Sequence, residues 1–69
     1  MSSISKLLGE KVKVLRKNAG LTQEQLAEKA EIDLSYLGRI EMGQENPSLK
    51  YLNKLATALG VKVPELTDF

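Results

Sequence analysis

The outer face of one short segment, Leu34 to Met42, carries side chains suited to binding. At helical spacing, the face away from the apolar positions holds Leu34, Ser35, Gly38, Arg39 and Met42. A guanidinium can donate to two acceptors at once, and a hydroxyl can donate or accept. Glycine inside a helix costs about 1 kcal/mol relative to alanine, and close approach of a large partner, such as the major-groove edge of a base pair, would compensate for Gly38. This face predicts a recognition surface.

Local signals predict that this segment is the second of two short helices joined by a tight turn. Thr22 followed by Gln25 fits a capping box, so a helix should begin just after Thr22. Asp33 repeats the device as a carboxylate cap, so the second helix should begin at about Leu34. The inward-facing apolar positions are Leu26, Ala27, Ala30, Ile32, Leu37 and Ile40. Residues 22–42 therefore have the layout of a helix-turn-helix.

The motif continues in both directions. TQEQLAEKAEIDLSYLGRIE is preceded by LRKNAGLTQEQLA, which overlaps its start, and followed by NPSLKYLNKLATALGV. With these stretches, nearly the whole chain resembles the phage lambda-repressor-like (Xre-type) helix-turn-helix DNA-binding family. Its IDLSYLGRIE segment, followed by Asn46, is most similar to the small controller proteins of restriction–modification systems. The resemblance implies an all-α fold of five helices that binds double-stranded DNA.

The resemblance also implies roles for individual residues. The base-reading positions are Leu34, Ser35 and Arg39; an arginine can fork onto N7 and O6 of guanine, and a leucine can pack on a thymine methyl. The positions expected to contact the DNA backbone are Gln23, Tyr36, Gln44, Asn46 and Lys17. For Gln23 the physics agrees, because a helix N-terminus attracts anions.

Alternatives stay open for several of these side chains. Arg39 could instead form a surface ion pair with Glu41 or Glu45, and Leu34 could be an added core residue. Gln23 could be an ordinary exposed first-turn residue, and Lys17 part of a solvated helix face.

Three residues depart from the family pattern. Leu34 stands where controller proteins usually have arginine, so their target sequence cannot be transferred to this chain. Glu31 stands where the turn usually has glycine, and a left-handed backbone there would cost glutamate about 1 kcal/mol. Either the turn differs slightly from that of the family or this strain is tolerated. Glu45 replaces a residue that is often arginine, which would remove one phosphate contact.

Composition narrows the function classes. The chain has 69 residues, 42% of them hydrophobic, with three aromatics and neither cysteine nor histidine. Disulfides, the usual zinc sites and the commonest general base are therefore excluded. We expect one domain over 1–69 that is not an enzyme and has no metal, cofactor or small-molecule ligand. With no membrane-spanning run or signal peptide in view, we expect a cytoplasmic protein.

The charge is polarised, although the net charge is only +1. Residues 1–20 carry four more cations than acids, whereas residues 21–48 carry four fewer. An acidic middle implies few phosphate contacts per subunit, which favours a dimer.

Three further helices should complete the fold. One runs from about Ser5 to Asn18, a fourth is capped by Ser48 and ended by Gly60, and a short fifth carries Leu66 and ends at Phe69. Family position also pairs Arg16 with Glu41 in a partly buried salt bridge.

The apolar C-terminus suggests a homodimer interface built from Val63, Leu66 and Phe69, with Val61 beside them. Alternatively, Val61 and Leu66 close the core of the monomer. The expected function is a dimeric transcription regulator on a palindromic operator, with Leu34–Met42 in the major groove. An antitoxin of a toxin–antitoxin pair, or a protein-interaction module that has lost DNA binding, remain as alternatives.

Overall fold

A computed structural model describes residues 3–69, which form five helices and no strand. The helices are α1 (Ser3–Asn18), α2 (Gln23–Ala30), α3 (Leu34–Glu41), α4 (Leu49–Leu59) and α5 (Val63–Thr67). The predicted all-α fold is confirmed for this part of the chain. Residues 1 and 2 of the domain expected over 1–69 lie outside the described residues.

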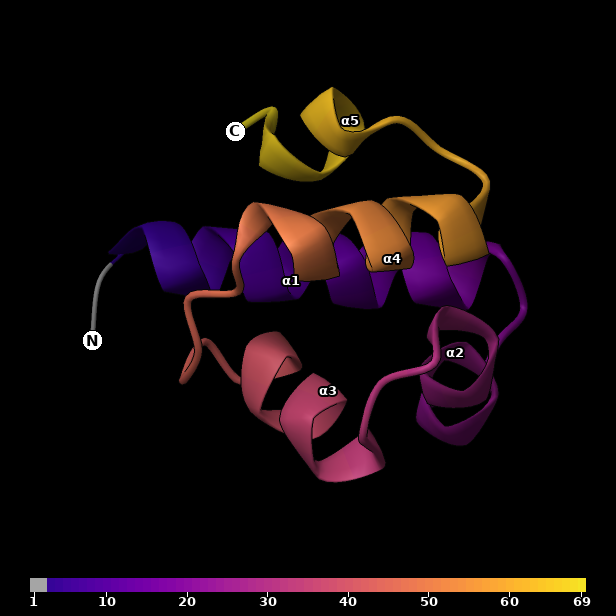
Figure 1. Cartoon of the computed structure of the whole chain (residues 1–69). Coiled ribbons are helices and arrows are strands. Elements are labelled where there is room, and N and C mark those ends of the chain that lie inside the picture. Colours follow the sequence, from indigo (N-terminus) through magenta and orange to yellow (C-terminus); the bar gives the residue numbers. More distant parts are fainter. Residues whose placement is uncertain (1–2) are drawn as a thin grey trace.

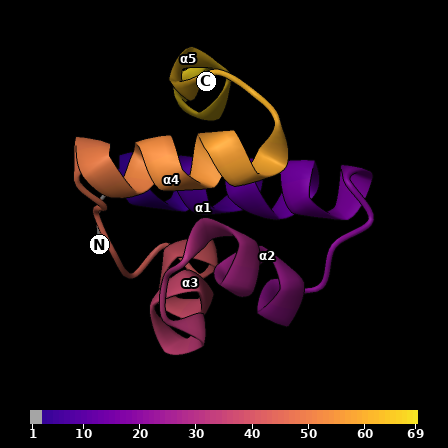
Figure 2. The same ribbon diagram turned by 45° about the vertical axis from the view of Figure 1, so that its right-hand side comes forward.

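The helices surround one apolar core. α1 and α4 lie alongside each other, with α2 and α3 on one side of them and α5 on the other (Figures 1 and 2). α1 packs against α3 and α5, and α2 packs against α3 and α4. The largest fully buried side chains come from all five helices: Val12, Leu26, Leu37, Ile40, Leu55 and Leu66. α3 is thereby fixed on the side opposite α5. Within residues 3–69, no helix has both the length and the apolar character needed to cross a membrane.

The starts predicted for α2, α3 and α4 are correct, but only α2 has the expected side-chain cap. α1 begins at Ser3, two residues before the expected Ser5. The Gln25 amide donates to Thr22 Oγ1 at 3.1 Å, and the Thr22 amide donates to Gln25 Oε1 at 2.9 Å, which completes the capping box. Asp33 and Ser48 occupy the N-cap positions of α3 and α4, yet neither side chain makes a capping hydrogen bond. The prediction of these two caps is wrong. Both side chains are exposed, so water can solvate them and the helix amides instead.

The turn between α2 and α3 is left-handed at Glu31, the position where the family usually has glycine. Its φ and ψ are 58° and 48°, and it is the one non-glycine residue with positive φ within residues 3–69. A glutamate side chain in this region costs about 1 kcal/mol relative to glycine. The family geometry of the turn is therefore kept at a conformational cost.

The C-terminal segment differs from the expectation. α5 ends at Thr67 rather than at Phe69, and Leu66 is completely buried in the core of its own subunit. Leu66 therefore cannot be an interface residue in this conformation, because α1 and α4 already pack against the short helix that carries it. Val61 and Val63 also pack partly against the core. Phe69, by contrast, is 49% exposed.

Candidate nucleic-acid interface

The outer face of α3 is open to solvent. Ser35 is exposed and Leu34 is 44% exposed, so the alternative of Leu34 as an added core residue does not hold. A Cβ built on Gly38 would meet no atom within 4 Å apart from its chain neighbours and the backbone of its own helix. Packing within the described chain therefore gives no reason for a glycine at this position. The space beside Gly38 is free for a partner to approach the helix backbone.

Arg39 extends this face and forms an ion pair with the loop that follows α3. Its Nε donates to Glu45 Oε2 at 2.9 Å, and the two side chains are 43% and 31% exposed. Of the two acids considered as partners for Arg39, Glu45 is the one it contacts. The Arg39 guanidinium also lies over the Tyr36 ring, with Cζ 5.7 Å from the ring centroid.

Tyr36 is held between α3 and α4. Its ring centroid lies 5.0 Å from that of Tyr51 in a tilted arrangement, within the range of favourable aromatic pairs. Burial raises the pKa of Tyr36, as do, to a smaller extent, the Glu45 carboxylate and Tyr51, while Arg39 acts in the opposite direction. The hydroxyl therefore stays protonated at neutral pH and can donate a hydrogen bond, for example to a phosphate.

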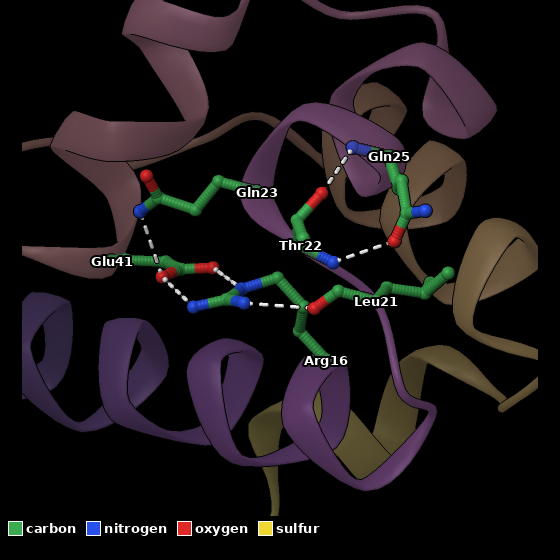
Figure 3. A network of polar contacts seen from close by, with 6 residues as sticks. All are labelled: Arg16, Leu21, Thr22, Gln23, Gln25 and Glu41. Carbon is green, nitrogen blue, oxygen red and sulfur yellow. Dashed lines mark hydrogen bonds and ion pairs between the residues drawn. The ribbon is translucent and has the colours of Figure 1, made fainter.

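Arg16 and Glu41 form the ion pair expected between α1 and the end of α3 (Figure 3). Arg16 Nε lies 2.7 Å from Glu41 Oε2, and Arg16 Nη2 lies 3.1 Å from Oε1. The third contact of the guanidinium runs from Nη1 to the Leu21 carbonyl oxygen at 2.9 Å. The side chains are only 11% and 1% exposed. Arg16 therefore has a structural role, and its guanidinium is not available to contact DNA.

Gln23 belongs to the same network. Its Nε2 donates to Glu41 Oε1 at 3.0 Å, so the first residue of α2 is tied to the last residue of α3 (Figure 3). An amide nitrogen has two N–H groups, and this bond uses one of them. Gln23 is therefore an oriented, half-buried residue at a helix N-terminus, rather than the freely exposed one of the alternative.

The other side chains assigned to the DNA backbone lie on the surface. Lys17, Gln44 and Asn46 are all exposed. The first is at the end of α1 and the other two are in the loop after α3. Their contacts with the DNA backbone stay predictions.

Gly9 has a positioning role that the sequence did not reveal. A Cβ there would overlap the Ile40 carbonyl oxygen and lie 2.9 Å from that of Glu41. α1 can therefore approach the end of α3 closely only with glycine at this point. The available signal was a glycine within a predicted helix, which often marks a close packing contact.

The residues described offer no metal site, since no three or more His, Cys, Asp or Glu side chains in 3–69 are grouped for one. The chemistry of the site is that of hydrogen bonding, charge and apolar contact.

Comparison with known proteins gives consistent matches. The family model described as HTH_3, helix-turn-helix, matches residues 12–66. The immunity repressor protein of Bacillus phage phi105 is 50% identical over 56 residues, which are 81% of this chain and 39% of the repressor. The transcriptional regulator SinR of Bacillus subtilis is 41% identical over 63 residues, 90% of this chain and 57% of SinR. The chain thus spans only part of the length of these two relatives.

Solved structures also match. The restriction–modification controller protein C.AhdI from Aeromonas hydrophila has a TM-score of 0.92 and 42% identity, covering 94% of this chain and 98% of that chain. The structure of SinR, described as the master regulator for biofilm formation, in complex with DNA has a TM-score of 0.83 and 40% identity, covering 86% and 95%.

Proposed function

Because the chain belongs to the HTH_3 helix-turn-helix family, we propose that it is a sequence-specific DNA-binding transcription regulator that acts as a homodimer on a palindromic operator. The observation that carries the proposal is the outer face of α3, where Arg39, Ser35 and Leu34 surround an unobstructed Gly38. The solved complex of the similar SinR with DNA supports the same partner class.

In this proposal α3 lies in the major groove. Arg39 donates to a guanine, Ser35 contacts a base edge, and Leu34 packs on a thymine methyl. The N-terminus of α2 faces a phosphate, where its free amides and positive dipole end favour an anion. The further backbone contacts are made by Gln23, Lys17, Tyr36, Gln44 and Asn46.

Two subunits are needed because one subunit offers a single short recognition helix within an acidic stretch. In a symmetric dimer the two α3 helices would enter successive major grooves about 34 Å apart, the spacing of phage repressors on their operators. With Leu66 buried, we propose that the interface uses Phe69 and the exposed part of Val63. The names of the similar proteins, a repressor and a controller protein, describe regulation rather than catalysis. We propose regulation without enzymatic activity, in the cytoplasm.

Selection from a library of random-sequence duplexes tests the function directly. The wild-type protein should enrich an imperfect palindrome, and its affinity should fall steeply between two salt concentrations, as phosphate contacts require. Arg39→Ala should weaken binding to the selected duplex by about 5- to 150-fold, the equivalent of losing one bidentate base contact. It should also relax the sequence selectivity at one base pair. Gln23→Ala should instead weaken binding to all sequences alike.

Two results would contradict the proposal. If no sequence is enriched, and binding to duplex DNA is absent at low salt, the acidic middle marks a protein-interaction module instead, such as an antitoxin surface. If Arg39→Ala weakens binding equally on the selected and scrambled duplexes, Arg39 is only a backbone contact.

A further inference from the structure

The ion pair between Arg39 and Glu45 leaves the outer end of the guanidinium free. Glu45 binds Arg39 through Nε, the inner nitrogen next to the aliphatic stem. Within residues 3–69, neither terminal amino group of Arg39 has a hydrogen-bond partner. Two parallel donors at the end of a planar group are what the N7 and O6 acceptors of a guanine require. The ion pair is therefore compatible with base reading and does not occupy the donors that reading would use.

A second contact lies on one side of the same guanidinium. Its Cζ lies 5.7 Å from the centroid of the Tyr36 ring, and that ring is itself packed against Tyr51 at 5.0 Å. Arg39 is thus restrained at its inner edge by a carboxylate and on one side by an aromatic ring. An unrestrained arginine would lose more side-chain entropy when it bound a base.

Stability does not account for Glu45. The pair is 43% and 31% exposed, and ion pairs with this exposure contribute little to folding. An acid beside a DNA-binding helix also repels phosphates, which weakens binding unless the same residue favours binding in another way.

We propose that Glu45 is a positioning residue for base recognition, which fixes Arg39 with its terminal amino groups free to select a guanine. The inference rests on the proposed function and adds a determinant of its specificity. The competing possibility is that Glu45 merely neutralises Arg39, in which case its removal would strengthen binding to every sequence.

Measuring Kd for the selected duplex and for a scrambled duplex of the same composition separates these possibilities. Glu45→Ala should weaken binding to the selected duplex by about 2- to 13-fold, the cost of ordering one long side chain upon binding. It should leave binding to the scrambled duplex unchanged or slightly tighter. Glu45→Gln keeps an acceptor for Nε and should be more selective than Glu45→Ala. The control is Glu24→Gln, which removes an exposed acid from the first turn of α2. It should tighten binding to both duplexes by the same factor.

The dependence on Arg39 is tested in an Arg39→Ala background, where Glu45→Ala should no longer change the ratio of the two Kd values. Replacing the contacted guanine by 7-deazaguanine, which lacks the N7 acceptor, should weaken DNA binding by the wild type more than it weakens DNA binding by the Glu45→Ala variant. The inference is overturned if Glu45→Ala tightens binding to both duplexes equally. It is also overturned if Glu45→Ala still changes the ratio of the two Kd values in the Arg39→Ala background. If the wild type enriches no sequence at all, the proposed function fails first, and this inference fails with it.

Discussion

Removing one partner of the buried Arg16–Glu41 pair should strongly destabilise the domain. Arg16→Met keeps much of the aliphatic volume but removes the three donors that reach Glu41 and the Leu21 carbonyl oxygen. Within residues 3–69, the Glu41 side chain, only 1% exposed, would then keep the amide of Gln23 as its one side-chain partner. Leaving a buried charge without its counterion costs about 3–5 kcal/mol. A domain of this size has a total stability of about 3–10 kcal/mol, so a large part of it should be lost.

Thermal unfolding followed by circular dichroism at 222 nm measures this loss. Each kcal/mol lowers the Tm of a domain of this size by about 4–8 °C, so Arg16→Met should lower it by about 12 °C or more. Arg39→Met is the matched control, because its pair with Glu45 is largely exposed and should contribute at most about 1 kcal/mol. The double variant Arg16→Met/Glu41→Leu should recover part of the loss, since it leaves no unpaired buried charge. An Arg16→Met variant with the same Tm as the Arg39→Met control would refute the reasoning.

Three further predictions concern backbone and caps. Gly38→Ala should raise the stability by up to about 1 kcal/mol through helix propensity yet weaken binding to the selected duplex, and unimpaired DNA binding by this variant would contradict the prediction. Gly9→Ala should lower the stability, because its Cβ would overlap the Ile40 carbonyl oxygen. Urea unfolding measures the stability, and fluorescence anisotropy measures DNA binding. Glu31→Gly should raise the urea midpoint by relieving about 1 kcal/mol of left-handed strain; an unchanged or lower midpoint would show that the turn is not strained. Thr22→Ala should cost about 0.5–2 kcal/mol, and Asp33→Ala clearly less because Asp33 makes no capping bond; equal losses in urea unfolding would contradict the assignment.

The features predicted well from sequence depend on neighbours along the chain. The capping box of Thr22 and Gln25 involves residues three apart, so its residue types alone fix the start of α2. The left-handed turn at Glu31 was suggested only by the glycine that the family usually has at this position, and the sequence left it open. The Arg16–Glu41 pair spans 25 residues, and it was accessible only through family resemblance.

The features that were mispredicted, left open or missed depend on packing or on solvent. The apolar character of Leu66 indicates that it is buried, but not whether its own subunit or a second copy buries it. Asp33 has the residue type of a cap, yet the bond depends on a rotamer that an exposed side chain is free to leave. The choice between Glu41 and Glu45 as the partner of Arg39 depends on which acid is turned toward the core. Gly9 matters only because of two carbonyl groups far away in sequence.

The attachment of α3 at one end has a consequence for how such a protein can change its target. Glu41, the last residue of the helix, is held by Arg16 and Gln23 and lies against Gly9, while Leu34 at the other end is 44% exposed. Substitutions at the free end should therefore be nearly neutral for folding, so they can be exchanged in combination without compensating changes elsewhere. The domain should be readily evolvable: a regulator could acquire a new operator by altering a few side chains on α3 while the rest of the sequence stays as it is.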